Sequence, residues 1–445
     1  MGKYQGYPEY ELINAEWFSE IPTGWSVTPL KHVATINMGQ SPSSEDCNID
    51  GIGVPFLQGN AEFGAKSPTE KQFCPIPKKV AKAGDLLFSV RAPVGALNFA
   101  NKDFGIGRGL CSIRGTNAVS QTFLWWVLPS YKYQFDAIAT GSTFEAVSAE
   151  EVGNLNLALP PMVEQTQIAN FLDHETAKID TLIKKQQLLI KLLKEKRQAV
   201  ISHAVTKGLN PQAPMRDSGV QWLGEVPKHW DSCLIKYKCS EVTDGAHISP
   251  ETNGGEHYFV SIRDIKDGVI NFEEALLTSP KSYQYLVKTG CLPFDGDILF
   301  SKDGTIGQTA ITPKDIEFVV ASSLIIIRPD REKVTPEFLD FLLQSSVVKE
   351  QVESFVKGAA LRRLSIQNLL KVFGVFPPLD EQVLIAEFIQ HQLSKYRELE
   401  RKAIDQVELL KERRTALISA AVTGKIDVRN WQAPTSQVQA LEQTA

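Results

Sequence analysis

The sequence repeats itself at a distance of about half its length, and this feature restricts the possible folds more than any other. PPMVEQTQIANFL, at Pro160–Leu172, returns 217 residues later as PPLDEQVLIAEFI, at Pro377–Ile389. Further along, EKRQAVISHAVT (Glu195–Thr206) matches ERRTALISAAVT (Glu412–Thr423) at eight of twelve positions. The chain of 445 residues is therefore a tandem duplication of about 210 residues, unlike the short periods of a solenoid.

The correspondence also extends toward the N-terminus. GDLLFSVRAPVG, at Gly84–Gly95, returns as GDILFSKDGTIG, at Gly296–Gly307. EWFSEIPTGW, at Glu16–Trp25, returns as QWLGEVPKHW, at Gln221–Trp230. The spacing between copies shortens here to 212 and 205 residues, so the copies differ in length at a few places but keep the same order of segments.

The first half of each copy predicts a mixed domain. LLFSV (Leu86–Val90) and SLIIIRP (Ser323–Pro329) are short apolar runs typical of strands. QTFLWWVL (Gln121–Leu128) and PEFLDFLLQ (Pro336–Gln344) have the apolar spacing of helices. Three aromatic side chains are expected in the domain cores: Trp125, Trp126 and Phe341.

The second half of each copy predicts one long helix, over residues 160–207 and 377–424. A pair of prolines begins each helix, because proline is tolerated in the first turn and not later. Glu164 and Glu381 suit the positive end of the helix dipole. A glycine at each C-terminus ends the helix.

A spacing of three and four residues marks an apolar stripe along each long helix. The first stripe is Ile168, Leu172, Glu175, Ile179, Leu182, Gln186, Leu189, Leu193, Lys196, Val200 and His203. The second stripe is Ile385, Ile389, Gln392, Tyr396, Leu399, Ala403, Gln406, Leu410, Arg413, Leu417 and Ala420. Helices this long with one stripe each are expected to pack on each other as a coiled coil.

A pseudo-two-fold axis is the simplest relation between two copies, and two helices packed about such an axis run antiparallel. The N-terminal segment should then lie where the second helix ends. The polar stripe positions Gln186, Gln406 and Lys196 either fix the register or mark places where the seam opens. Four lysines of the first helix are expected on a solvated face or a partner surface: Lys184, Lys185, Lys191 and Lys194.

The predicted fold class is α+β. Two mixed α/β domains, related by pseudo-two-fold symmetry, are separated by two long antiparallel helices that form a coiled-coil spacer. The predicted parts are a first mixed domain (1–159), a first helix (160–207), a linker and second mixed domain (208–376), a second helix (377–424) and a poorly ordered tail (425–445).

Composition and missing motifs exclude several classes of protein. No apolar run approaches the ~20 residues of a membrane helix, so a cytoplasmic location is expected. The six cysteines form no C-x-x-C pair, which argues against a zinc module or a disulfide framework. No phosphate loop, H-E-x-x-H or G-x-S-x-G motif is present, so a self-sufficient enzyme is not expected. The net charge of −5 leaves any nucleic-acid binding to local patches or to partners.

The repeated phrases together resemble a known family. A helix opening P-P-x-x-E-Q-x-x-I-A-x-F-[LI] and closing A-x-I-S-x-A-V-T, and a segment ending E-[IV]-P-x-x-W, each occur twice. Over essentially the whole chain, this pattern resembles the DNA-specificity subunit of type I restriction-modification systems.

The resemblance implies a DNA-binding function without catalysis. Each mixed domain would be a target recognition domain that reads one half of a split, asymmetric site in double-stranded DNA, and the helices would set the gap. Two modification subunits would bind S-adenosylmethionine and methylate adenine. Restriction subunits would add ATP-driven translocation and cleavage. S-adenosylmethionine, ATP and Mg are therefore expected only in the partner subunits, and this chain is expected to have no cofactor and no catalytic residue.

Domains that read different half-sites should share a scaffold and differ at their reading groups. Val90-Arg91 corresponds to Lys302-Asp303, and Gly141–Glu145 corresponds to Gly358–Arg362. Arg and Lys suit guanine, Gln and Asn suit adenine, and Thr offers a hydroxyl or a methyl group. The candidate DNA-binding residues are Arg91, Thr143, Lys302, Arg362 and Arg363, followed by Gln58, Asn60 and Arg263.

Two other repeated features are interpreted as structural. Asp85 and Asp297 each follow a glycine and precede a strand, and a turn-initiating aspartate explains both. Ser148 and Glu151 predict a capping box that begins a short helix after the candidate loop of the first copy.

Three alternative functions stay open. The chain could be a structural scaffold whose helices join two protein-binding domains, or a specificity protein that serves a methyltransferase alone. An intrinsic methyltransferase is the third. Against it, LPPM and FPPL share only their prolines with the base-binding loop of amino-methyltransferases.

Overall fold

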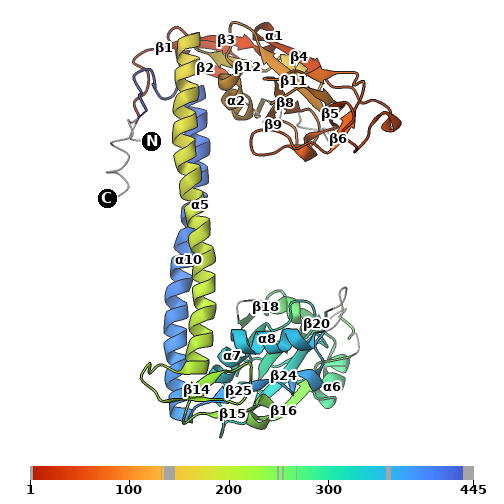
Figure 1. Ribbon diagram of the computed structural model, residues 1–445, viewed down its shortest axis with the longest axis vertical. Helices are drawn as coiled ribbons and strands as arrows, with labels where there is room; N and C mark the ends of the chain where they lie inside the picture. The colour runs from red at the N-terminus through yellow and green to blue at the C-terminus, as the bar shows by residue number, and fades with distance from the viewer. Residues whose placement is uncertain are drawn as a thin grey trace. The chain divides into compact units, whose positions relative to one another are not determined.

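The computed structural model of the chain describes residues 4–433 apart from 132, 135–145, 248–249, 253–254, 267 and 357–361. These residues form two compact units (Figure 1). The first unit combines residues 1–185 with 406–445, and the second unit comprises residues 186–405. Each unit therefore takes one part of both long helices, whereas the sequence predicted domains that follow one another along the chain.

The first unit contains two four-stranded sheets and two strand pairs. One sheet has the order β4 (Ala34–Met38), β11 (Leu110–Gly115), β8 (Leu86–Ser89), β9 (Leu97–Phe99). The other has the order β6 (Gln72–Cys74), β5 (Val54–Leu57), β10 (Phe104–Ile106), β7 (Val80–Ala81). The pairs are β1 (Tyr10–Ala15) with β2 (Phe18–Pro22), and β3 (Ser26–Pro29) with β12 (Asn156–Leu159). The short helices among its described residues are α1 (Leu30–Val33), α2 (Gln121–Ser130), α4 (Ala149–Gly153), η1 (Ser44–Asp46) and η2 (Asn60–Glu62).

The second unit repeats this arrangement. Its four-stranded sheet has the order β16 (Cys239–Asp244), β24 (Leu324–Pro329), β21 (Ile298–Ser301), β22 (Thr309–Ile311). A three-stranded sheet has the order β20 (Leu276–Thr278), β17 (His257–Val260), β23 (Phe318–Val320). The pairs are β13 (Met215–Asp217) with β14 (Glu225–Pro227), β15 (Asp231–Leu234) with β25 (Phe373–Phe376), and β18 (Ile265–Lys266) with β19 (Val269–Ile270). Its short helices are α6 (Pro280–Lys288), α7 (Pro336–Gln344), α8 (Ser346–Phe355), α9 (Ile366–Leu369), η3 (Ile235–Lys238) and η4 (Ile262–Asp264).

The predicted strands and helices of the mixed domains are confirmed. β8 and β21, the equivalent inner strands, are buried at every residue, which explains why their sequences are apolar without alternation. Trp126 and Phe341 are buried as expected, whereas Trp125 is half-buried and stacks on Phe99 with a ring distance of 4.8 Å.

The long helices α5 (Met162–Lys207) and α10 (Leu379–Val422) begin directly after the second proline of each pair. The prolines therefore precede the helices instead of lying in their first turns. The Pro161 carbonyl accepts a hydrogen bond from the N–H of Gln165 at 3.0 Å, as does that of Pro378 from Gln382. After each helix a glycine takes a left-handed conformation, with φ of 76° at Gly208 and 74° at Gly424.

Within the first unit, α5 and α10 run antiparallel. Leu172 and Ala421 belong to one buried cluster, and further along α5 the Asp180 carboxylate lies 2.9 Å from Arg414, which precedes Ala421 on α10. Later positions of α5 therefore contact earlier positions of α10.

The second unit shows the same direction. Glu400 of α10 lies 3.8 Å from Arg197 of α5, and Ile389 shares a buried cluster with Ile201. The predicted α+β class, with two mixed domains and two long antiparallel helices, is confirmed.

The predicted apolar stripes of the two long helices are displaced by one residue at some positions. Ile168, Leu172 and Ile179 are buried as expected, but four later apolar or basic positions face solvent: Leu182, Leu189, Lys196 and Leu399. Ile183 and Ile190 turn inward instead of the two leucines. At both places two adjacent residues are apolar, a leucine followed by an isoleucine. A spacing of three or four residues therefore fits either of them. Gln406 and Arg413 are likewise exposed, while Val407 is buried and Arg414 half-buried.

The segments at the two ends of the described chain meet in the first unit. The N–H of Asp427 donates to the Gln5 carbonyl at 2.8 Å, and the Tyr10 hydroxyl donates to the Gly424 carbonyl at 3.0 Å. The expectation that the N-terminal segment lies where the second helix ends is confirmed.

The tail was expected to be poorly ordered from residue 425 onward, and the structure differs from this over residues 425–433. Ile426 and Val428 are buried, and the Trp431 ring packs edge-on against Phe171 at 5.4 Å. These apolar residues anchor a segment whose overall composition is polar. Residues 434–445 lie outside the described residues.

No helix in the described ranges is both long enough and apolar enough to cross a membrane.

Candidate nucleic-acid interface

The repeated phrase that opens each long helix locks the helix to its mixed domain. Gln165 is fully buried, and its amide donates to the carbonyls of Pro160 (2.9 Å) and Ala118 (3.0 Å). Its side-chain oxygen accepts from the N–H of Ser120 at 2.8 Å, just before α2. Gln382 makes the same three bonds in the second unit. Each unit has one such joint between its mixed domain and the start of a long helix, which explains why the glutamine occurs in both copies.

The preceding glutamate has an equally repeated role. The indole N–H of Trp25 donates to Glu164, and that of Trp230 donates to Glu381, both at 3.1 Å. Tyr7 also donates to Glu164, and burial raises the pKa of this tyrosine. The two tryptophans of the repeated E-[IV]-P-x-x-W segment thus fix the segment to the start of each long helix.

Asp85 and Asp297 are structural, as interpreted. Each carboxylate accepts the backbone N–H three residues earlier at 2.8 Å, which closes a turn. Each also pairs with an arginine of the neighbouring strand, Arg114 for Asp85 and Arg328 for Asp297.

The described residues at or directly next to the segments that differ between the copies lie side by side in both units. In the first unit the N–H of Val147 donates to the Val90 carbonyl at 2.8 Å, and Arg91 forms an antiparallel bridge with Ala146. In the second unit the N–H of Leu364 donates to the Lys302 carbonyl at 2.9 Å, and Asp303 bridges Arg363. The comparison of copies had selected Val90-Arg91, Lys302-Asp303 and Arg363, and the described residues bring Arg363 beside Asp303. The other selected residues, 141–145 and 358–361, lie outside the described residues.

A third and a fourth segment join them. In the first unit the N–H of Gly109 donates to the Gln58 carbonyl at 3.1 Å, and its own carbonyl accepts from Val90 at 3.0 Å. A Cβ on Gly109 would lie 2.7 Å from the Gln58 carbonyl, so only glycine allows this approach. In the second unit Ser323 takes the place of Gly109 and bonds both Lys302 and Ile262.

We call this arrangement the loop face. In the first unit it comprises residues 58–60, 90–91, 107–109 and 146–147, and in the second unit residues 261–263, 302–303, 321–323 and 363–364. The predicted capping box lies directly behind it in the first unit: the N–H of Ser148 donates to Glu151 at 2.7 Å, which lowers the pKa of that carboxyl. The capping box therefore fixes the start of α4, and the last loop of this face ends there.

Of the candidate residues in the first unit, Arg91 and Gln58 are exposed on the loop face. The Gln58 amide donates to the Ser41 hydroxyl at 2.8 Å, which orients it. Asn60 is half-buried and begins η2. Thr143 lies outside the described residues.

Of the candidate residues in the second unit, Arg263 is exposed in η4. Arg363 is about half exposed and lies 3.1 Å from Asp303, and Arg362 pairs with Glu353. Lys302 is only 3% exposed, and its ammonium bonds the Asp244 carboxylate. This burial favours a positioning role for Lys302, and direct DNA contact by each of these residues stays a prediction.

Sequence reasoning missed one basic residue of the loop face. Arg108 is exposed between Gly107 and Gly109, and its backbone N–H donates to the Ser41 hydroxyl at 3.2 Å. The glycines on either side were the available signal, since they allow the turn to approach Gln58 closely.

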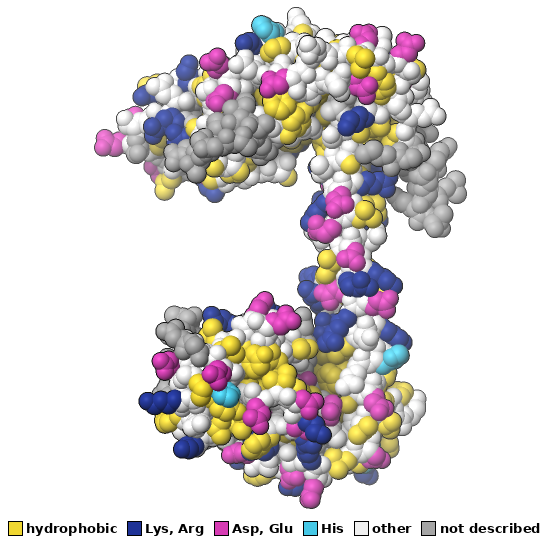
Figure 2. Space-filling model, turned by 180° about the vertical axis from the view of Figure 1, so that it is seen from behind, with side chains coloured by type: hydrophobic (Ala, Val, Ile, Leu, Met, Phe, Trp, Pro, Cys, Tyr) yellow, Lys and Arg dark blue, Asp and Glu magenta, His cyan; other side chains and the backbone are white. Residues whose placement is uncertain are grey.

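Acidic and basic side chains are interspersed over both mixed domains on the face shown in Figure 2. On this face, any phosphate contact would therefore come from small groups of basic residues. Within the described ranges, no three His, Cys, Asp or Glu side chains lie close enough together to hold a metal ion.

Comparison with known proteins identifies the family. The model of the type I restriction modification DNA specificity domain matches residues 22–192 and 246–409, once in each copy. The chain belongs to this family.

Relatives in the specificity family match along the whole chain or along one copy. The specificity subunit of the type I restriction enzyme EcoBI from Escherichia coli is 22% identical over 95% of this chain and 91% of its own length. A putative MjaX specificity subunit from Methanocaldococcus jannaschii is 35% identical over 46% of each chain.

Two solved structures share the fold. A chain from a study of complex assembly and conformational transition in the type I R-M system has a TM-score of 0.71 at 17% identity, and covers 91% of this chain and 99% of its own. The HsdS subunit from Thermoanaerobacter tengcongensis has a TM-score of 0.54 at 18% identity, and covers 91% of this chain and 98% of its own.

Proposed function

We propose that the chain binds a split, asymmetric DNA sequence, with one half-site read by each mixed domain and the gap set by α5 and α10. One observation carries this proposal: each unit presents the same four loops from the same scaffold, and the loops differ in chemistry between units. Scaffold residues such as Gln165 and Gln382 repeat, whereas Arg91 and Asp303 occupy equivalent positions. A duplicated protein that recognises two different half-sites needs a common scaffold with different side chains in its loops.

The loop faces offer the groups that read base edges in the major groove. In the first unit, Arg91 and Arg108 suit the O6 and N7 acceptors of guanine, and the Gln58 amide suits adenine. In the second unit, Arg263 and Arg363 are the corresponding guanine-reading groups. The Asp303 carboxylate, 3.1 Å from Arg363, fixes the guanidinium in the free protein and can itself accept from cytosine N4.

In this proposal the chain supplies recognition and no chemistry. Two modification subunits that bind S-adenosylmethionine would methylate adenine in the bound site. Restriction subunits would use ATP and Mg for translocation and cleavage. Several lysines of α5 are exposed and could contact a protein partner, among them Lys184, Lys185 and Lys191.

The test is adenine methylation across the genome of a host that lacks other such systems. The chain is expressed with its modification subunit, and the modification subunit is expressed alone as control. The expected result is methylation at one split motif, only when the chain is present. A complex that assembles without any motif would contradict the proposal and favour the scaffold function.

A domain exchange tests the assignment of half-sites. Residues 1–150 are replaced by the corresponding domain of another family member, so that only the first loop face changes. One half-site should change while the other half-site and the gap stay the same. A change in both half-sites would show that the two domains do not read independently.

A further inference from the structure

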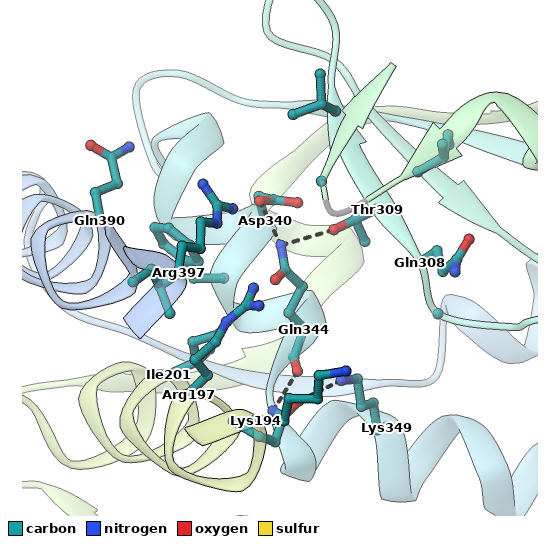
Figure 3. Close-up of a pocket in the computed structure, with 17 residues that line it drawn as sticks. Lys194, Arg197, Ile201, Gln308, Thr309, Asp340, Gln344, Lys349, Gln390 and Arg397 are labelled. Atoms are coloured by element: carbon teal, nitrogen blue, oxygen red, sulfur yellow. Dashed lines mark hydrogen bonds between the residues drawn. The ribbon is translucent and has the colours of Figure 1, made fainter. Parts of the chain in front are cut away.

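The second unit contains a cavity of about 560 Å³ where α5 and α10 meet the mixed domain (Figure 3). Side chains of α7 and β22 form one wall, and the two long helices form the other. Four basic side chains line it: Lys194 and Arg197 of α5, Arg397 of α10 and Lys349 of α8. Two of the lining neutral groups, Gln308 and Gln390, can also donate hydrogen bonds.

The described side chains that line this cavity are mostly basic where they are charged. Glu400 is shared between Lys194 at 3.3 Å and Arg197 at 3.8 Å, so one carboxylate serves two bases. Lys349 donates to the neutral amide of Gln198 at 2.6 Å. Asp340 is the one acidic residue among the described lining side chains, and it accepts from Gln344 at 2.7 Å. Basic side chains thus outnumber acidic ones among the described lining residues, in a chain whose net charge is −5.

The equivalent place in the first unit is built differently. There Asp180 stands where the second unit has Arg397, and it pairs with Arg414 at 2.9 Å, so the charges cancel. Trp125 stands where the second unit has Asp340, and it stacks on Phe99. The two copies therefore differ in charge at this place, and the shared packing of the helices does not require an arginine at 397 or an aspartate at 340.

The cavity adjoins the loop face of the second unit. Gly307 and Gln308 line it, and they end the turn that begins with Lys302 and Asp303. Gly268 and Val269 also line it, in the β18–β19 hairpin that directly follows η4 and its Arg263. An anion held here would lie beside the groups that the proposed function assigns to base reading.

We propose that this cavity binds a phosphate group of the DNA backbone beside the second half-site. The proposal rests on the proposed function. Guanidinium groups such as those of Arg197 and Arg397 suit phosphate oxygens, because their paired N–H donors match the geometry of the anion. A phosphate held between a long helix and the mixed domain fixes the position of the domain on the duplex, and it carries no sequence information itself.

The test measures DNA affinity against salt concentration, with the chain assembled with its modification subunit and a duplex that carries the methylated motif's sequence. The variant is Arg197→Gln with Arg397→Gln. Affinity should fall about tenfold or more, since hydrogen bonds to charged groups are lost. The slope of log K against log salt should become shallower by about 0.9 for one lost phosphate contact. The methylation motif should stay the same.

Two further variants test whether a changed salt slope comes from the lost charge, from misfolding or from the location of the residues. Arg197→Lys with Arg397→Lys keeps both charges and should retain most of the salt slope. Lys411→Gln with Arg414→Gln removes two charges at the equivalent place in the first unit and should leave the slope unchanged. Circular dichroism checks that each variant is folded.

Several outcomes would overturn the phosphate site while leaving the proposed function intact. These are an unchanged slope in the glutamine variant, an altered methylation motif, or loss of assembly with the modification subunit, which would indicate that an acidic protein segment fills the cavity. If the unaltered complex shows no sequence preference at all, the proposed function itself fails.

Discussion

Phe171 and Phe388 occupy equivalent positions, 217 residues apart, yet Phe171 is fully buried and Phe388 is 39% exposed. In the first unit, the rings of Tyr4 and Trp431 pack edge-on against Phe171 at 5.1 and 5.4 Å. In the second unit, Phe388 lines an open cavity of about 400 Å³ with α5 residues, because the chain after Leu209 leads away into β13. The two copies therefore share the long helices, but the chain segments next to the helices differ, and they cover Phe171 and leave Phe388 exposed.

The largest difference should come from truncating these two phenylalanines. Phe171→Ala removes a fully buried ring and should cost about 3–5 kcal/mol of unfolding free energy, whereas Phe388→Ala should cost about 1 kcal/mol or less. Urea unfolding of the two variants measures the costs, and hydrogen exchange assigns each to its unit. Equal costs would mean that Phe388 is covered in solution, and the comparison would be wrong.

The two helix joints should behave alike. Gln165→Leu and Gln382→Leu each leave two backbone carbonyls and one N–H without their partner, at a cost of about 3 kcal/mol or more. Each variant should increase hydrogen exchange at the start of its own long helix and at the start of α2 or α7. A cost seen at only one joint would show that the repeated phrase does not have one common structural role.

Asp340 should give the second unit a pH dependence that the first unit lacks, since Trp125 takes its place there. Burial raises the pKa of Asp340 to about 6, and the negative charge of Glu337 adds to this. A raised pKa in the folded state means that the protonated form favours folding, so stability is fully present below about pH 4 and falls as pH rises through 6.

Asp340→Asn should remove this dependence and stabilise the chain at pH 8 by about 2–3 kcal/mol, at about 1.4 kcal/mol for each unit of pKa. Urea unfolding at pH 4, 6 and 8 makes the measurement. The control is Asp380→Asn, an exposed carboxylate in the first turn of α10. A variant that is less stable than the unaltered chain at pH 8 would contradict the prediction.

The smallest effect is expected for the ion pair between the helices of the first unit. Asp180 and Arg414 are 45% and 35% exposed, so solvent screens their attraction. A double-mutant cycle with Asp180→Ala and Arg414→Ala should give a coupling of about 0.2–1 kcal/mol. A larger value would mean that charge, and not only apolar packing, holds this part of the helix pair together.

The duplication made the scaffold predictable, because each copy serves as a check on the other. The strands β8 and β21 and the adjoining loops could be located by comparing the copies, and the start of each long helix could be located to within two residues. The same comparison selected Val90-Arg91, and the fold placed it beside Ala146.

Contacts between distant residues limited the remaining predictions. Leu182 and Ile183 are both apolar, and the choice between them depends on the partner helix. Lys302 is buried through Asp244, 58 residues earlier, and no local pattern indicates that pairing. The packing of Trp431 on Phe171 spans 260 residues, so the tail alone could not reveal it.

The composition of the first unit has a consequence for the order of folding during synthesis. Its core includes Ala420, Ala421 and Val428, which are synthesised after the whole of the second unit. The second unit, residues 186–405, is complete in sequence before they appear. The residues of the first unit up to 185 therefore keep part of their apolar surface uncovered while the second unit is synthesised. A chaperone that binds nascent chains would meet this surface.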